Sequence, residues 1–264
     1  MIGAIAGDII GSVYERRQIK TTDFPLFQNH CRFTDDSVLT VAIAKAILEG
    51  TSYLSAVKEL GRRYPNAGYG GSFFRWLFSE SSEPYNSWAN GSAMRVSPVG
   101  FAFGDAERVL DEAAKTAVIT HNHPEGIKGA QAVALSVLLA RTGHRKSQIR
   151  ESVQSRFDYD LDRTVDQIRP GYRFDVSCKG SVPESIIAFL DSTSFEDAVR
   201  KAVSLGGDSD TMACMAGAIA EAYYGGVPKD IVEKVRASLT DDLWDITSEF
   251  CAKYYDLSIR TLED

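Results

Sequence analysis

The 264-residue chain carries 29 basic and 36 acidic residues, giving a formal net charge of −7, and 44% of its residues are hydrophobic. This length supports one substantial core, and the acidic balance excludes a broad surface for nucleic-acid backbones. Its apolar runs are shorter than the roughly 20 residues that span a bilayer, and its four scattered cysteines form no CxxC pair. We therefore expect one domain over residues 1–264, with no membrane partner, in a reducing cytoplasmic setting.

The first expected element is an apolar helix over residues 2–13. Gly3, Gly7 and Gly11 recur every four residues in it and give it one face for close contact with another helix. A helix that is apolar on nearly every side belongs at the centre of a fold. Asp8 lies inside this segment and Glu15 follows it. Buried carboxylates are costly unless they are paired, protonated or bound to cations, so these two acids are the first indication of function.

Further helices follow from the spacing of apolar residues. In chain order we predict helices at 36–49, around 72–79, and at 106–119, 125–141, 194–205, 211–224, 229–239 and 243–255. Convincing strand patterns are absent from the sequence, which makes the expected class all-α. Residues 65–92 and 155–182 resist a helical interpretation, and long irregular stretches in compact domains often form binding loops. A variable surface loop is an equally good description of residues 155–182.

Two acidic motifs begin apolar helices. FTDDSVLT at 33–40 and LGGDSDT at 205–211 each place two aspartates beside a threonine. One side chain is enough to cap a helix, so capping leaves one aspartate of each motif unexplained. The motifs offer only oxygen ligands, which suit Mg²⁺ or Mn²⁺ better than zinc, and four carboxylates balance two divalent cations. We predict that the motifs meet at two such cations, each aspartate capping its helix with one oxygen and binding metal with the other.

The remaining motifs are less specific. THNHP at 120–124 holds two of the four histidines, but a single HxH ahead of a helix is more often a capping element than a metal site. The chain has neither GxGxxG nor GxxxxGK[ST], so nothing indicates a Rossmann fold or a P-loop.

Five motifs, taken in chain order, resemble those of a known protein family. AGDIIGSVYE, FTDDSVLT, NGSAMRVSPVG, THNHPEGIKGAQAV and GGDSDTMACMAGAI together resemble the ADP-ribosylglycohydrolase family, which includes the dinitrogenase-reductase-activating glycohydrolases and the ADP-ribosyl-acceptor hydrolases. The resemblance runs through most of the chain. It implies a compact, orthogonal multi-helix fold with a binuclear Mg²⁺ or Mn²⁺ centre.

The resemblance also assigns roles to individual residues. The implied metal ligands are Thr34, Asp35, Asp36, Asp208, Asp210 and Thr211. Glu15 matches the family glutamate that approaches the scissile bond, and we take it, with Asp35 and Asp36, as catalytic. The candidate substrate-binding residues are Ser87, Trp88, Asn90, Gly91, Ser92, His121 and Ser209.

The resulting hypothesis is a metal-dependent hydrolase that cleaves the glycosidic bond between ADP-ribose and a protein, nucleic-acid or small-molecule acceptor. Its partner is an ADP-ribosylated substrate or ADP-ribose itself, and we expect it to act as a monomer. One alternative is a module that binds ADP-ribose or a nucleotide without hydrolysing it. Another is an all-α, Mg²⁺-dependent diphosphate enzyme, whose usual DDxxD spacing is replaced here by DDSVL at 35–39.

Overall fold

A computed structural model describes residues 1–255, and it is built from helices throughout. β structure within these residues is limited to one isolated antiparallel bridge between Ala89 and Ser177. The prediction of an all-α fold is confirmed. The helices are α1 (Ile2–Gly11), α2 (Asp35–Glu49), α3 (Tyr53–Arg63), α4 (Gly71–Phe78), α5 (Gly91–Met94), α6 (Ser97–Ala102), α7 (Ala106–Val118), α8 (Pro124–Arg141), α9 (Lys146–Phe157), α10 (Val165–Ile168), α11 (Cys178–Leu190), α12 (Phe195–Ser204), α13 (Ser209–Tyr224), α14 (Lys229–Ser238) and α15 (Asp241–Tyr254).

The helices expected from apolar spacing all form, with ends shifted by a few residues. The expectation for 155–182 was partly wrong. The end of α9, the short α10 and the first turn of α11 all fall within that stretch. The sequence does not reveal α11, because Pro183 lies inside it and the polar residues Ser181, Glu184 and Ser185 interrupt its apolar spacing.

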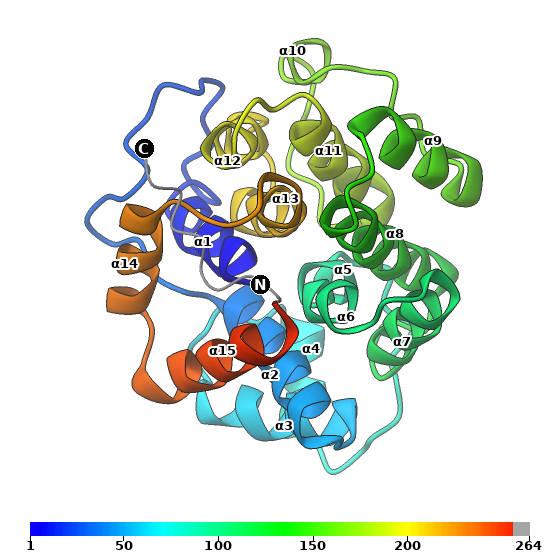
Figure 1. The fold of residues 1–264 in the computed structure, drawn as a ribbon. Coiled ribbons are helices and arrows are strands. Elements are labelled where there is room, and N and C mark those ends of the chain that lie inside the picture. The colour runs from blue at the N-terminus through cyan, green and yellow to red at the C-terminus, as the bar shows by residue number, and fades with distance from the viewer. Residues whose placement is uncertain (256–264) are drawn as a thin grey trace.

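Helices α1 and α13 pack along each other at the centre of the molecule (Figure 1). The glycines of α1 make this approach possible. A Cβ atom at Gly11 would lie 2.5 Å from Asp210 Cα, and one at Gly7 would overlap the backbone of Ala213. The prediction that the glycine face mediates close helix contact is confirmed, and the contact brings α1 directly against the start of α13.

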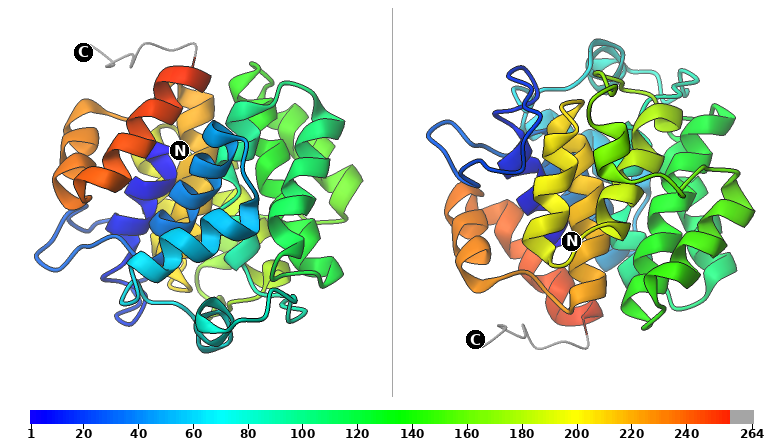
Figure 2. Two further views of the ribbon diagram at one scale, coloured as in Figure 1. Left: turned by 90° about the horizontal axis from the view of Figure 1, so that it is seen from below. Right: turned by 90° about the horizontal axis from the view of Figure 1, so that it is seen from above.

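The other helices surround this central pair. α12 and α11 pack against α13 on one side, while α2 packs against α1 and is covered by α3 and α15 (Figure 1). The long segments between α1 and α2 and between α4 and α5 lie towards the same end of the molecule (Figure 2). Among the described helices, none combines the length and apolar character needed to cross a membrane.

Candidate metal centre and cleft

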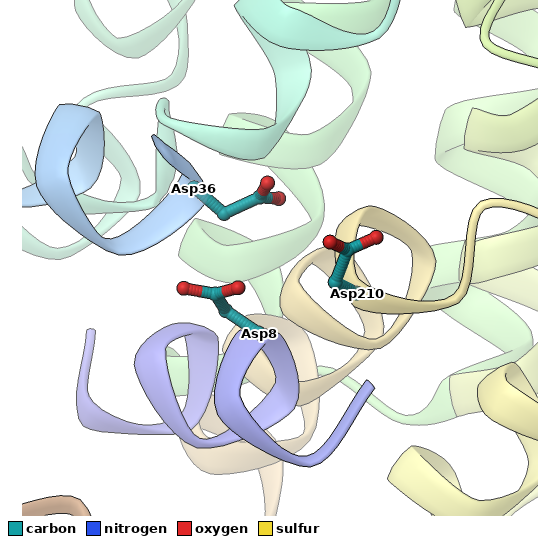
Figure 3. A group of neighbouring side chains, drawn as sticks. All are labelled: Asp8, Asp36 and Asp210. Atoms are coloured by element: carbon teal, nitrogen blue, oxygen red, sulfur yellow. The ribbon is translucent and has the colours of Figure 1, made fainter. Parts of the chain in front are cut away.

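Three buried aspartates from three helices meet at the ends of α1, α2 and α13. Asp8, Asp36 and Asp210 each point a carboxylate into one shared space, and one oxygen of each lies within 4.8 Å of the others (Figure 3). The Thr211 hydroxyl donates to Asp36 Oδ2 at 3.3 Å, although the two residues are 175 positions apart. The acidic motifs at 33–40 and 205–211 therefore converge, as the sequence predicted.

Asp8 fixes the start of α2. Its Oδ2 accepts the backbone N–H groups of Thr34 at 2.8 Å and Ser37 at 3.1 Å. The Thr34 hydroxyl donates to Asp8 Oδ1 at 2.6 Å, and the Ser37 hydroxyl donates to Oδ2. A carboxylate from a neighbouring helix thus satisfies donors that a helix start leaves free. This arrangement leaves the side chain of Asp36 available for another partner.

The expectation that each aspartate caps its own helix was wrong at both motifs. The N-cap of α2 is Thr34 and not Asp35 or Asp36. Asp208 occupies the N-cap position of α13 but makes no side-chain capping bond. Its backbone has ψ 80°, whereas the N-cap Thr34 of α2 is extended. The Asp208 carboxylate instead accepts a hydrogen bond from Asn90 Nδ2 at 2.8 Å. Asn90 therefore ties the segment before α5 to the start of α13.

Burial and mutual repulsion raise the pKa values of these carboxyl groups. Burial is the main cause for Asp35, and the charge of Asp8 adds to it, bringing the pKa to about 8. The pKa values of Asp36 and Asp210 are raised well above their usual range, first by burial and then by neighbouring aspartates. Asp36 Oδ1 is also buried and has no hydrogen-bond partner among residues 1–255. Crowded, oxygen-only donors with an unpaired buried oxygen fit a hard divalent cation.

A cleft of about 480 Å³ opens above the carboxylates. The residues assigned to the site from sequence that line it are Glu15, Thr34, Asp35, Asp36, Ser87, Trp88, Asn90, Gly91, His121, Asp208, Asp210 and Thr211. Ser92 and Ser209 are fully buried behind its walls. The Ser92 hydroxyl donates to Gly126 O at 2.7 Å, and that of Ser209 faces Gly207 O at 3.2 Å.

The two histidines of THNHP have separate positions. His123 accepts the Glu125 backbone N–H at its Nδ1, 3.1 Å away, and caps α8. His121 instead lines the cleft. His123 is therefore a capping element, as the sequence predicted, and the aspartate cluster within the described residues consists of Asp8, Asp36 and Asp210.

Sequence reasoning missed several residues of the site. Asp8 was noted as a buried acid, but its contact with the start of α2 depends on how the helices pack. Arg95 and Phe174, which the sequence did not single out, also line the cleft, together with Tyr85 from the 65–92 stretch. The Ala89–Ser177 bridge places the Phe174 segment beside Trp88. The only signal for Arg95 was a single charge in the apolar run SAMRVSPVG.

The fold and the site define an all-α protein with a cleft above a cluster of buried carboxylates. The sequence model of the family described as ADP-ribosylglycohydrolase matches residues 1–258. The chain belongs to this family and is a glycohydrolase.

Curated relatives and a solved structure agree with this assignment. The ADP-ribosylhydrolase ARH3 of Xenopus tropicalis is 27% identical over 85% of this chain and 86% of its own length. The Homo sapiens ARH3 is 26% identical over 85% and 84%. The ADP-ribosylarginine hydrolase Tri1 of Pseudomonas putida (strain GB-1) is 29% identical over 59% of this chain and 46% of its own. A solved structure titled ADP-ribosylglycohydrolase-related protein complex superposes with a TM-score of 0.69 at 21% identity, covering 96% of both chains, which confirms the fold.

Proposed function

We propose that this protein hydrolyses the bond between C1 of the distal ribose of an ADP-ribosyl group and its acceptor, releasing ADP-ribose, with two divalent cations at the acidic centre. One observation carries the proposal. Both acidic motifs meet at the base of a cleft that Glu15 also lines, and the unpartnered Asp36 Oδ1 lies among them. The choice of an ADP-ribosyl group as substrate follows from the names of the relatives, ADP-ribosylhydrolase and ADP-ribosylarginine hydrolase.

The residues that would hold Mg²⁺ or Mn²⁺ are Thr34, Asp35, Asp36, Asp208, Asp210 and Thr211. When bound, such cations provide a Lewis acid and lower the pKa of coordinated water. Asp8 supports these proposed ligands indirectly, because it fixes Thr34 at the start of α2 and leaves the side chain of Asp36 free. Asn90 holds Asp208 in the same manner.

Glu15 is the proposed proton acceptor and donor. It lines the cleft, and its charge contributes to the raised pKa values of Asp35, Asp208 and Asp210. Cleavage at an anomeric carbon passes through an oxocarbenium-like transition state, which needs an activated water and help for the leaving group. A carboxylate beside the centre, yet open to the cleft, suits both proton transfers.

The rest of the cleft would bind the nucleotide part of the substrate. Its volume of about 480 Å³ lies within the usual range for small-molecule sites. Ser87, Trp88, Gly91 and His121 line it, and Trp88 is half exposed at 51%. In this proposal Trp88 offers an aromatic surface, His121 a polar group and Gly91 space for a close approach. Ser92 and Ser209 would contribute by supporting the walls behind Gly91 and Asp210.

A panel of substrates tests the proposal. ADP-ribose linked to arginine, to serine, to a nucleobase and to a small O-acyl acceptor is incubated with the protein and either Mg²⁺ or Mn²⁺. Released ADP-ribose is quantified, with a chelator in a parallel series. We expect release from at least one substrate, suppressed by the chelator and restored by the cation. Release that is indifferent to the chelator would show that the proposed metal mechanism is wrong.

A further inference from the structure

Arg95 is a buried cation with no carboxylate partner among the described residues. Its side chain is fully buried although it borders the cleft. Nη2 donates to Thr116 O at 2.8 Å and to Thr120 Oγ1 at 2.9 Å, while Nε and Nη1 have no partner within residues 1–255. An unpaired buried charge is expensive, so this arrangement calls for a functional explanation.

The hydroxyl of Thr120 connects this cation to His121. Thr120 is fully buried, and its Oγ1 lies 2.7 Å from His121 Nδ1. A guanidinium nitrogen only donates hydrogen bonds, so Thr120 Oγ1 accepts from Arg95, and the hydroxyl hydrogen of Thr120 still needs an acceptor. The lone pair of His121 Nδ1 is that acceptor. The reverse arrangement, with a hydrogen on Nδ1, leaves the buried hydroxyl hydrogen without an acceptor, which is costly.

The opposite nitrogen of His121 faces the binding region. A Cβ atom added to Gly91 would lie 3.0 Å from His121 Nε2, and both residues line the cleft. No side chain or backbone group of residues 1–255 hydrogen-bonds to Nε2. Burial, and then the charge of Arg95, lower the pKa of His121 well below its usual range, so the ring is neutral. The other titratable neighbour is Tyr85, whose pKa burial raises to about 12.

We propose that Arg95 and Thr120 are positioning residues that hold His121 as the neutral tautomer with hydrogen on Nε2, so that it presents a fixed N–H donor to an acceptor oxygen of the bound substrate. The identity of that oxygen rests on the proposed function, whereas the tautomer does not. His121 then acts as a hydrogen-bond donor and not as a general base, because the lone pair on Nδ1 is already engaged by Thr120.

The test compares three threonine variants. Thr120→Val removes the hydroxyl at nearly constant shape, and Thr120→Ser keeps it. Thr116→Val is the matched control. It removes an equally buried hydroxyl one helical turn earlier, one that bonds Ala113 O at 2.8 Å and leaves the Thr116 carbonyl for Arg95. The tautomer is read from long-range ¹H–¹⁵N correlation spectra of protein labelled at histidine, with the His121 signals assigned by their loss in His121→Gln.

In the wild type we expect His121 to show a protonated Nε2 and an unprotonated Nδ1 near neutral pH. Thr120→Val should abolish this preference, while Thr120→Ser and Thr116→Val retain it. The dissociation constant for ADP-ribose, measured calorimetrically, should rise about tenfold in Thr120→Val alone, as for one lost hydrogen bond to a charged group. A hydrogen on Nδ1 in the wild type, or an unchanged His121 spectrum in Thr120→Val, overturns the proposal. If the wild type shows the expected tautomer but does not bind ADP-ribose, that outcome counts against the proposed function only.

Discussion

Two groups of buried ionisable residues line the same cleft, and they are electrostatic opposites. In the acidic group, Asp36 and Asp210 share one buried space, and Asp36 Oδ1 has no hydrogen-bond partner in the described part of the chain. In the other group, Arg95 keeps two guanidinium nitrogens unpaired beside His121. Both arrangements cost stability in the free protein, as is common where residues serve function. The first is complementary to cations, and the second is complementary to the oxygen atoms of an anionic ligand.

The largest expected effect comes from removing one charge of the acidic group. Asp36→Asn and Asp210→Asn each remove a proposed cation ligand. Since bound metal contributes several kcal/mol of transition-state stabilisation, kcat should fall by roughly a thousandfold or more. Release of ADP-ribose gives the rate, and titration calorimetry with Mn²⁺ gives the loss of metal binding.

Stability should move in the opposite direction in these two variants. Because each substitution relieves repulsion between buried carboxylates, the variants should melt at a higher temperature than the wild type when both are in chelator. Their far-UV circular dichroism should stay helical. Wild-type turnover by Asp36→Asn would sink the proposed role of the acidic group.

The pH dependence of stability provides the next test. The pKa of Asp35 is raised from 3.8 to about 8, so the folded chain holds this proton over a range in which the unfolded chain has lost it. The contribution to stability is present at low pH and is lost as pH rises through that interval. Without metal, the melting temperature should decline from pH 5 to pH 8. Added Mg²⁺ should raise it more at pH 8 than at pH 6, because cations bind the ionised carboxylates. An equal gain at both values contradicts this account.

The geometry that joins α1 to α13 can be disturbed by one methyl group. The added Cβ in Gly11→Ala would lie 2.5 Å from Asp210 Cα, and such overpacking typically costs about 1–3 kcal/mol. Urea unfolding should show this loss, and Mn²⁺ affinity should drop as well. Gly104→Ala is the control, since its Cβ would meet nothing within 4 Å. Equal stability of the two variants would mean that the contact between α1 and α13 can adjust to the added methyl group.

A smaller effect is expected on the cationic side of the cleft. The Cβ in Gly91→Ala would lie 3.0 Å from His121 Nε2 and should displace the ring. Losing one hydrogen bond to a charged substrate group should raise KM about tenfold, whereas Mn²⁺ affinity stays at the wild-type value. A change in Mn²⁺ affinity would show that the two groups are coupled and not separate.

The smallest effect is expected at the rim. Trp88 is exposed and lines the cleft, so Trp88→Ala should raise KM by less than about tenfold with little change in kcat, as for one lost aromatic contact. Phe74→Ala is the matched control, because Phe74 is similarly exposed at 43% against 51% and does not line the cleft. Identical steady-state kinetics for the two variants would remove Trp88 from the binding surface.

The sequence was informative where chemistry is local. Apolar spacing located most of the long helices but missed α3, α9 and α11, together with the short α5, α6 and α10. Paired aspartates at helix starts located the acidic group. It failed where the partner is distant along the chain. Asp8 caps α2 from another helix, and the bridge between Ala89 and Ser177 joins two irregular segments that have no mutual pattern. Arg95 was overlooked because the sequence does not show that its side chain is buried or which partners it has in the folded molecule.

The close packing of α1 on α13 also bears on how the protein becomes active. Asp8 and Asp210 share one space only when the first helix has closed on a segment about two hundred residues later. Contacts between residues so far apart in the sequence form slowly, because chain entropy is lost before the contact energy is gained. A folding intermediate lacking this closure would also lack the proposed cation site. The appearance of metal affinity during refolding would therefore time the completion of the native fold.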